Sequence, residues 1–184
     1  MNPTENMPAK KPPQSLLLKI GVPLLIVLAI AGLWLAKNKS APTNDAVPNN
    51  PDFALEADSS LDLERLKSYG LPILLDFSAD WCAPCKEMEP ILRKLNQDLQ
   101  GKAIIKIVNT EELPAIASQY PVTVIPTQFL FDSAGNPYGQ EGAYAPYMKF
   151  YSTRDTEEHV LTAHEGLMYE EDLLALLREM GLEA

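Results

Sequence analysis

The sequence contains few residues that bind metals or form covalent cross-links. Among its 184 residues are two cysteines and two histidines. Two cysteines exclude a scaffold held together by several disulfide bonds. The histidines, His159 and His164, lie five residues apart on an expected strand, so their side chains should point to opposite faces. A four-ligand zinc site is therefore excluded, we predict no metal site, and we interpret both histidines as ordinary strand residues.

Basic residues are also scarce. The chain has 15 lysines and arginines against 25 aspartates and glutamates, which gives a net charge of −10. Proteins that bind nucleic acid need a basic surface to contact phosphates, so we predict no nucleic-acid partner. The first 51 residues contain five lysines and two acidic residues. The acidic excess therefore belongs to the rest of the chain, where we interpret it as a solvated domain surface.

One long apolar run stands near the start of the chain. Residues 16–36 read LLLKIGVPLLIVLAIAGLWLA and carry no charge after Lys19. About 20 apolar residues span roughly one bilayer at about 1.5 Å per residue. Proline-rich flanks argue against a buried soluble helix. We predict an uncleaved transmembrane anchor, and a cleaved signal peptide remains the alternative, with a loosely fitting cleavage site at 29–31.

The anchor divides the chain into parts on two sides of a membrane. Lys10, Lys11 and Lys19 precede the uncharged part of the run, which begins at Ile20, and two lysines follow it, which points the N-terminus inward. Residues 1–15 are then a cytoplasmic tail, and the rest of the chain is extracytoplasmic, where disulfides persist. Residues 37–58 are polar and proline-containing and are expected to be a flexible linker. The sequence thus predicts a single-pass protein of the cell membrane that contacts the lipid bilayer through residues 16–36.

From residue 59 onward, patterns typical of strands and helices alternate. Strands are expected at 71–77, 103–108, 127–131 and 159–164, and helices at 59–70, 82–100, 111–120 and 169–181. Strands that alternate with helices and end in a hairpin predict an α/β domain over residues 59–184, with a central mixed β-sheet flanked by helices on both faces.

Both cysteines lie in one short motif, WCAPCK, at residues 81–86. Covalent haem attachment needs a histidine where Lys86 stands, and a purely structural disulfide closing so small a ring would stabilise little. A redox-active dithiol remains. Cys82 follows a buried strand and opens a helix, whose N–H groups and dipole stabilise a thiolate. We expect the Cys82–Cys85 pair to act without a separate cofactor.

The surroundings of this motif resemble the thioredoxin family. The segment DFSADWCAPCK (76–86) has that family's strand, turn and C-x-x-C helix, and VIPT (124–127) is similar to its cis-proline loop. Pro90 and Gly166 match a proline within that helix and a glycine before the last helix. The resemblance spans residues 59–184 and implies a thioredoxin-like fold and thiol–disulfide oxidoreductase activity.

The resemblance also implies catalytic roles. Cys82 would be the attacking nucleophile and Cys85 the resolving thiol. Pro126, in cis, would lie against the dithiol and present its backbone to the substrate. Asp76 would exchange a proton with Cys85. A carboxyl group within an apolar strand should have a raised pKa, which suits proton transfer near neutral pH.

Further residues are assigned to substrate binding and support. Lys106 matches a lysine that pairs with the buried acid in the family, so it is a candidate auxiliary residue. Ala83 replaces the glycine most usual between the cysteines, which bears on the redox potential. A contact surface for the substrate would be formed by Trp81, Ala83, Pro84 and Ile125.

These features predict a membrane-anchored enzyme that reduces protein disulfides and is itself reduced by a membrane thiol electron carrier. Ile125 before the proline is the thioredoxin-type residue and favours a reductant. A disulfide oxidase or isomerase is the alternative within the same class. A binding module is the alternative from another class. It would dock a partner through residues 138–158, an aromatic-rich insertion between the last two strands that could instead cover the core.

Overall fold

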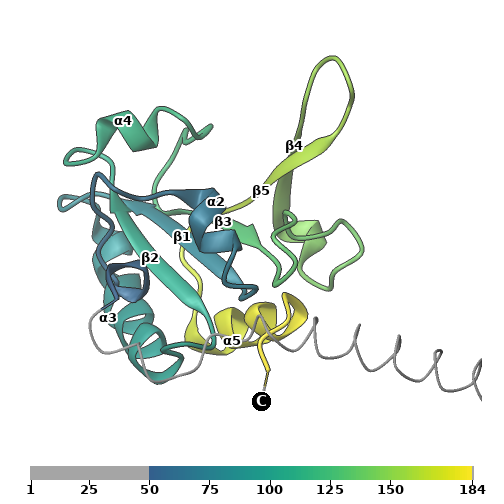
Figure 1. The fold of residues 1–184 in the computed structure, drawn as a ribbon. Helices are drawn as coiled ribbons and strands as arrows, with labels where there is room; N and C mark the ends of the chain where they lie inside the picture. The colour runs from purple at the N-terminus through teal and green to yellow at the C-terminus, as the bar shows by residue number, and fades with distance from the viewer. Residues whose placement is uncertain (1–49, 184) are drawn as a thin grey trace, which may run out of the picture. The chain divides into compact units, whose positions relative to one another are not determined.

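The computed structural model describes residues 50–183, which form a five-stranded sheet in the order β2-β1-β3-β5-β4 (Figure 1). Strand β1 (Ile73–Ser78) runs parallel to β2 (Ile104–Asn109) and antiparallel to β3 (Thr127–Phe131). Strand β5 (His159–Glu165) is antiparallel to β3 and to the edge strand β4 (Met148–Ser152). The predicted α/β fold with a mixed sheet is confirmed.

The helices are shorter than the sequence pattern predicts. They are α2 (Leu63–Lys67), α3 (Ala83–Asp98), α4 (Pro114–Ala117) and α5 (Glu170–Glu179). Within residues 50–183 no helix is long and apolar enough to cross a membrane. The expected tail, the expected anchor at 16–36 and the first part of the expected linker lie outside the described residues.

The sheet separates two apolar cores because alternate residues of each strand point to opposite faces. On one face, α3 and α5 pack against the sheet and also contact each other. This core includes Leu74, Met88, Leu92, Ile105, Leu130, Leu173 and Leu177. The other face packs with α2 and α4 and includes Leu66, Ile73, Leu75, Phe77, Ile116, Phe129 and Phe131. Strand β1 is therefore buried on both faces, as its continuous apolar run predicts.

The expected linker ends earlier than predicted. Residues 51–53 form a short 3-10 helix (η3, Pro51–Phe53), and Phe53 and Leu55 are each only 5% exposed. The N–H of Ile107 donates to Leu55 O over 2.7 Å, and the N–H of Ala57 donates to Ile107 O over 2.8 Å. The prediction of a flexible linker is thus wrong from residue 50 onward. The segment packs along the free edge of β2, where Phe53 and Leu55 are buried and polar side chains bond its backbone carbonyls.

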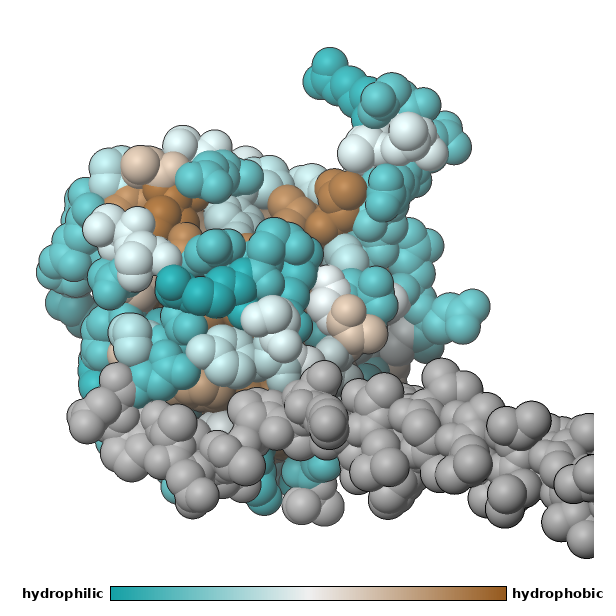
Figure 2. Space-filling view, in the orientation of Figure 1, coloured by the Kyte–Doolittle hydropathy of each residue, from teal (hydrophilic) through white to brown (hydrophobic). Residues whose placement is uncertain are grey.

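Part of the insertion at 138–158 belongs to the sheet and the core. It supplies strand β4, which the sequence did not predict, and it extends the sheet beside β5. Tyr138 is 4% exposed and Met148 is 9% exposed, and both belong to the core on the α3 and α5 face. The tip of the β4–β5 hairpin, at the upper right of Figures 1 and 2, is hydrophilic. A few side chains of the insertion therefore cover the core, whereas most of its residues are exposed, and the partner-docking interpretation stays a prediction.

Candidate active site

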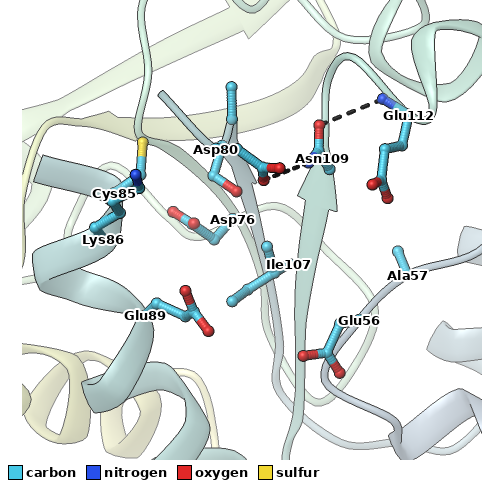
Figure 3. Close-up of a pocket in the computed structure, with 12 residues that line it drawn as sticks. Glu56, Ala57, Asp76, Asp80, Cys85, Lys86, Glu89, Ile107, Asn109 and Glu112 are labelled. Atoms are coloured by element: carbon cyan, nitrogen blue, oxygen red, sulfur yellow. Dashed lines mark hydrogen bonds between the residues drawn. The ribbon is translucent and has the colours of Figure 1, made fainter. Parts of the chain in front are cut away.

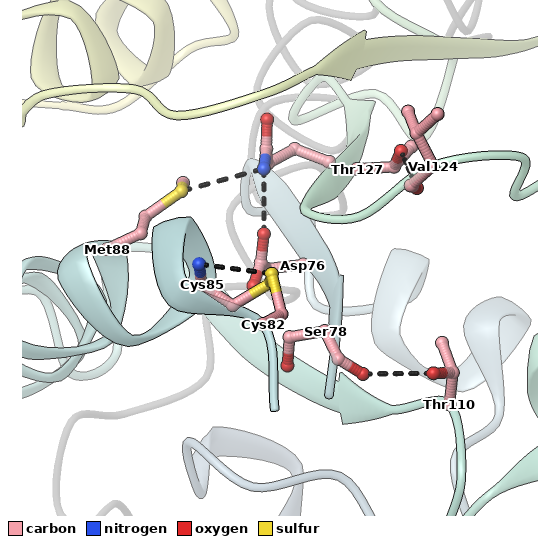
Figure 4. The surroundings of a disulfide bond; sticks show 9 residues. Asp76, Ser78, Cys82, Cys85, Met88, Thr110, Val124 and Thr127 are labelled. Atoms are coloured by element: carbon pink, nitrogen blue, oxygen red, sulfur yellow. Dashed lines mark hydrogen bonds between the residues drawn. A yellow bond between two sulfur atoms is a disulfide. The ribbon is translucent and has the colours of Figure 1, made fainter. Parts of the chain in front are cut away.

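The two cysteines form a disulfide at the start of α3 (Figure 4). Cys82 is the N-cap residue, with an extended backbone, and its sulfur accepts a hydrogen bond from the N–H of Cys85 over 3.3 Å. Pro84 occupies the first turn, where its missing N–H costs no helical hydrogen bond. The sulfur of Cys82 therefore lies at the N-terminus of α3 and accepts a hydrogen bond from one of its backbone N–H groups, and this position favours the thiolate form.

The buried acid Asp76 lies on β1, on the sheet face that α3 covers. Its side chain is almost completely buried, and it shares a cavity of about 490 Å³ with Cys85 (Figure 3). Burial raises the pKa of Asp76 to about 7, although a hydrogen bond from Gln128 opposes this rise. A carboxyl group that titrates near neutral pH can both accept and return a proton. The structure thus brings the predicted acid and the second cysteine to one polar cavity.

Other carboxylates line the same cavity and give it a polar wall. Glu56 and Glu89 each accept a hydrogen bond from Arg93 over 2.8 Å, and Asp80 accepts one from Asn109 over 3.0 Å. Such groups hold water and relay protons more readily than an apolar wall would. The cavity beside Asp76 therefore has a polar wall.

The expected cis-proline loop is present between α4 and β3. The Ile125–Pro126 peptide bond is cis, and Pro126 is buried. The carbonyl of Pro126 accepts a hydrogen bond from Gly166 over 2.9 Å, and Gly166 has a φ of +109° that favours glycine. Thr127 Oγ1 donates to Val124 O over 2.7 Å. Both ends of the loop are therefore fixed, and Figure 4 shows Val124 and Thr127 in the surroundings of the disulfide.

Two of the predicted substrate-binding residues share a groove. A second cavity, of about 600 Å³, is lined by Trp81 and Ile125 together with Thr110, the end of α4 at 117–118 and four residues of the segment 120–124. Trp81 is 69% exposed, which is unusual for so large an apolar side chain. Ala83 and Pro84 are exposed at the first turn of α3 but do not line this groove. The groove thus offers a largely apolar surface, and one of its residues, Trp81, directly precedes Cys82 in the chain.

The auxiliary role expected of Lys106 is wrong for this chain. Lys106 Nζ donates to Pro51 O over 3.0 Å and to Ala54 O over 2.9 Å. In the β1–β2 register Lys106 pairs with Leu75, not with Asp76, so its side chain points to the opposite face of the sheet. Lys106 therefore holds the segment before α2 in place, and the family's lysine–acid pair is absent from the described residues.

Asp76 has polar partners that the sequence analysis missed. Gln128 Nε2 donates to Asp76 Oδ1 over 2.7 Å, and Gln128 Oε1 lies 2.7 Å from His164 Nδ1. His164 is therefore not an ordinary strand residue. The available signal was a glutamine inside TQFLF, a strand otherwise expected to be buried. Its meaning required the strand order, which places β3 between β1 and β5.

The described residues 50–183 contain no group of three or more histidine, cysteine or acidic side chains placed to hold a metal ion. The functional groups that the structure brings together are instead a dithiol, a buried carboxyl group and an apolar groove. This set suits thiol–disulfide exchange, in which sulfur atoms exchange partners and a nearby base moves a proton.

Comparisons of the sequence with known proteins identify thioredoxins. The model of the family described as Thioredoxin matches residues 37–153. A thioredoxin from Rickettsia bellii is 43% identical over 74 residues, which cover 40% of this chain and 70% of that protein. A chloroplastic thioredoxin Y from Oryza sativa is 32% identical over 117 residues, covering 64% of this chain and 67% of that protein. A solved structure of a mutant thioredoxin from Halobacterium salinarum has a TM-score of 0.48 at 28% identity, covering 74% of this chain and 96% of that one.

Proposed function

The chain belongs to the thioredoxin family and is a thiol–disulfide oxidoreductase, and from this premise we propose that it reduces protein disulfides while anchored in a membrane, with its folded domain on the extracytoplasmic side. The observation that carries the reductase proposal is the cavity shared by Cys85 and Asp76. It provides a base for the resolving thiol at neutral pH. The nearby groove with Trp81 and Ile125 suits an extended protein segment better than a small polar molecule.

The proposed reaction has two steps. In the first, the Cys82 thiolate attacks one sulfur of the substrate disulfide, and the other substrate sulfur leaves as a thiolate. In the second, Cys85 gives its proton to the Asp76 carboxylate and attacks the Cys82 sulfur. The mixed disulfide breaks, the second substrate thiolate leaves, and the Cys82–Cys85 bond forms. Two electrons have then passed to the substrate, and the proton on Asp76 returns to solvent through the polar cavity.

The position at a membrane is supported by the sequence. Residues 16–36 are long and apolar enough for one crossing, and the lysine distribution favours an inward N-terminus. An extracytoplasmic reductase becomes oxidised at each turnover, so it needs a supply of electrons from the cytoplasmic side. We propose a membrane thiol carrier as that donor. It would reduce the Cys82–Cys85 disulfide by the same exchange reaction.

The reduction potential of the dithiol tests the direction of electron flow. The full chain in mild detergent is equilibrated with glutathione or dithiothreitol buffers, and the fraction of free thiols is measured by alkylation. A value near about −270 mV is expected for a reductant, whereas a value near about −120 mV would make the protein an oxidase. Cys85→Ser should trap a mixed disulfide with a protein substrate, while Cys82→Ser, as the matched control, should trap none.

The membrane location has a separate test. In intact cells that express the full chain, an added protease should cleave the domain only after the layer outside the cell membrane has been made permeable. The chain should also stay in the membrane fraction after an alkaline wash. Release by the alkaline wash would contradict the anchor. Protection of the domain after the barrier is opened, with cleavage only in lysed cells, would contradict the orientation. The Cys85→Ser variant should also trap the electron carrier from membranes.

A further inference from the structure

Three neighbouring strands present polar side chains in one row across the sheet. The register pairs Asp76 of β1 with Gln128 of β3, and Gln128 with His164 of β5. The three side chains therefore share the face that α3 and α5 cover. Asp76 and Gln128 are buried, at 1% and 0% exposed, and His164 is half-buried at the outer end of the row. A buried polar row of this kind is costly unless every member is paired.

The hydrogen bonds in the row have one direction. Gln128 Nε2 donates to Asp76 Oδ1 over 2.7 Å and to Met88 Sδ over 3.6 Å, which uses both hydrogens of the amide. Gln128 Oε1 is then left as an acceptor for His164 Nδ1, 2.7 Å away. The imidazole must carry its hydrogen on Nδ1 to make this bond. Each donor in the row therefore points toward Asp76, and donors stabilise a carboxylate in its ionised form.

We propose that Gln128 and His164 are positioning residues for the catalytic acid, holding a hydrogen-bond donor against Asp76 and so favouring the ionised form that accepts the proton of Cys85. This inference rests on the proposed role of Asp76 in the reductase reaction. Gln128 and His164 thus take the place of the lysine expected beside the acid, because Lys106 points to the other face of the sheet. In this chain the donor to the acid is a neutral amide, oriented by an imidazole, instead of a charged lysine.

The row has a second arrangement in which all of its hydrogen bonds are made. A glutamine amide carries no mobile proton, so the row does not conduct protons from His164 to Asp76. When Asp76 is protonated, its O–H can donate to Gln128 Oε1 if the amide turns over. Nε2 then donates to His164 Nδ1, and the imidazole hydrogen moves to Nε2. This arrangement places the amide oxygen toward Met88 Sδ and loses that contact, so the sulfur favours the first arrangement.

Charged groups surround both ends of the row. The charged groups that act on His164 are Asp172 of α5 and Glu165, the next residue of β5, whose carboxylate pairs with Lys149 over 2.6 Å. Burial lowers the pKa of His164, and these carboxylates oppose that effect. The lowered pKa favours the uncharged imidazole, which donates from Nδ1 in this row. The cavity at the other end is lined by the charged or titratable groups Glu56, Asp80, Cys85, Lys86, Glu89 and Glu112.

Direct titration of Asp76 tests the inference. The full chain is labelled with aspartate carrying ¹³C in its carboxyl group, reduced, and held in mild detergent, and Asp76→Asn identifies the Asp76 resonance. Gln128→Leu removes the donor, and the pKa of Asp76 should rise by about one pH unit or more. His164→Phe keeps a ring but no N–H, and it should raise the same pKa by a smaller amount. The pH midpoint of substrate release, the Cys85 step, should move upward by the same amount in each variant.

Two matched variants separate positioning from general damage to the fold. His164→Asn keeps a nitrogen donor bonded to Cγ, where Nδ1 of histidine stands, and it cannot become charged. It should restore both pH midpoints toward those of the wild-type protein. His159→Phe changes the other histidine of β5, which contacts Thr162 and not Gln128, and it should leave both midpoints unchanged. Circular dichroism checks that each variant is folded.

The outcomes distinguish this inference from the proposed function. An Asp76 titration that is the same in wild type, Gln128→Leu and His164→Phe would overturn the inference, whatever the activity. His164→Asn that behaves like His164→Phe would also overturn it, because the N–H would then have no role. If the titration moves as expected but the wild-type protein reduces no protein disulfide, the proposed function fails and the positioning of Asp76 stands.

Discussion

Replacing Asp76 with asparagine should make the protein more stable at neutral and alkaline pH. Asp76 is buried, and burial raises its pKa from an ordinary value of 3.8 to about 7. In the unfolded chain this carboxyl group loses its proton near the ordinary value. Between those two pH values the folded state keeps a proton that the unfolded state has lost, so stability falls as pH rises. Asparagine has the same shape and never ionises.

The size of the effect follows from the difference between the two pKa values. One pH unit corresponds to about 1.36 kcal/mol, so the ionisation of Asp76 costs the folded state about 4 kcal/mol once pH exceeds 7. The loss begins near pH 4 and is complete somewhat above pH 7. Wild type and Asp76→Asn should therefore have similar free energies of unfolding near pH 4. At pH 8 the variant should be more stable by about 2–4 kcal/mol, while its substrate-release step is slower because the base is gone.

Urea unfolding of the oxidised full chain in mild detergent, followed by far-UV circular dichroism at several pH values from 4 to 9, measures this difference. Asp98→Asn is the matched control. Asp98 is an exposed carboxylate on α3 whose ion pair with Lys94 lies at the surface, so its loss should leave the pH dependence of the wild-type protein in place. Unfolding free energies of wild type and Asp76→Asn that run parallel over this range would refute the reasoning. They would show that Asp76 does not titrate near neutral pH and would remove it as the base.

Three further changes test other parts of the structure. Lys106→Met should lower the free energy of unfolding by about 1–3 kcal/mol, because two backbone carbonyls of the segment 51–54 lose their donor. A changed pH profile of disulfide reduction in this variant would contradict the position of Lys106 on the sheet face away from Asp76. Trp81→Ala should raise KM for a protein disulfide about tenfold while the melting temperature stays constant, since the ring is 69% exposed. A small disulfide reagent is the control substrate, and the variant should reduce it at the wild-type rate. Gly142→Ala should destabilise the insertion by about 1–3 kcal/mol in thermal unfolding, because its Cβ would collide with the hydroxyl of Tyr138. An unchanged melting temperature would show that this contact is loose.

Local patterns in the sequence were sufficient for most of the fold. The apolar runs at 71–77 and 127–131 predict buried strands, and the structure has β1 and β3 at those places. Cap residues and apolar periodicity predict the helices, although their ends differ by several residues. Such features depend on neighbours in sequence, so they can be recognised without a tertiary structure. The insertion was harder, because β4 becomes a strand only through its hydrogen bonds to β5.

The candidate site likewise has features that depend on neighbours in sequence and features that depend on the tertiary structure. The C-x-x-C spacing and the helix that follows it come from a single local segment, and so does the apolar strand that contains Asp76. The partner of that acid depends on which residues lie opposite it on neighbouring strands, and a shift of one residue would reverse the choice. The sequence suggested Lys106, which the register places on the far face, and overlooked Gln128 and His164.

By itself, the sequence determined the chemistry of this protein: a dithiol at a helix start, an acid in an apolar strand and a proline loop in thioredoxin-like order. Only the tertiary structure decided how the acid is controlled, because hydrogen bonds across a sheet join residues 36 and 52 positions apart. It also decided that residues 50–57 belong to the folded domain, since burial depends on an edge strand that is far away in the sequence. Sequence patterns report short-range preferences, whereas strand order and register arise from the packing of the whole domain.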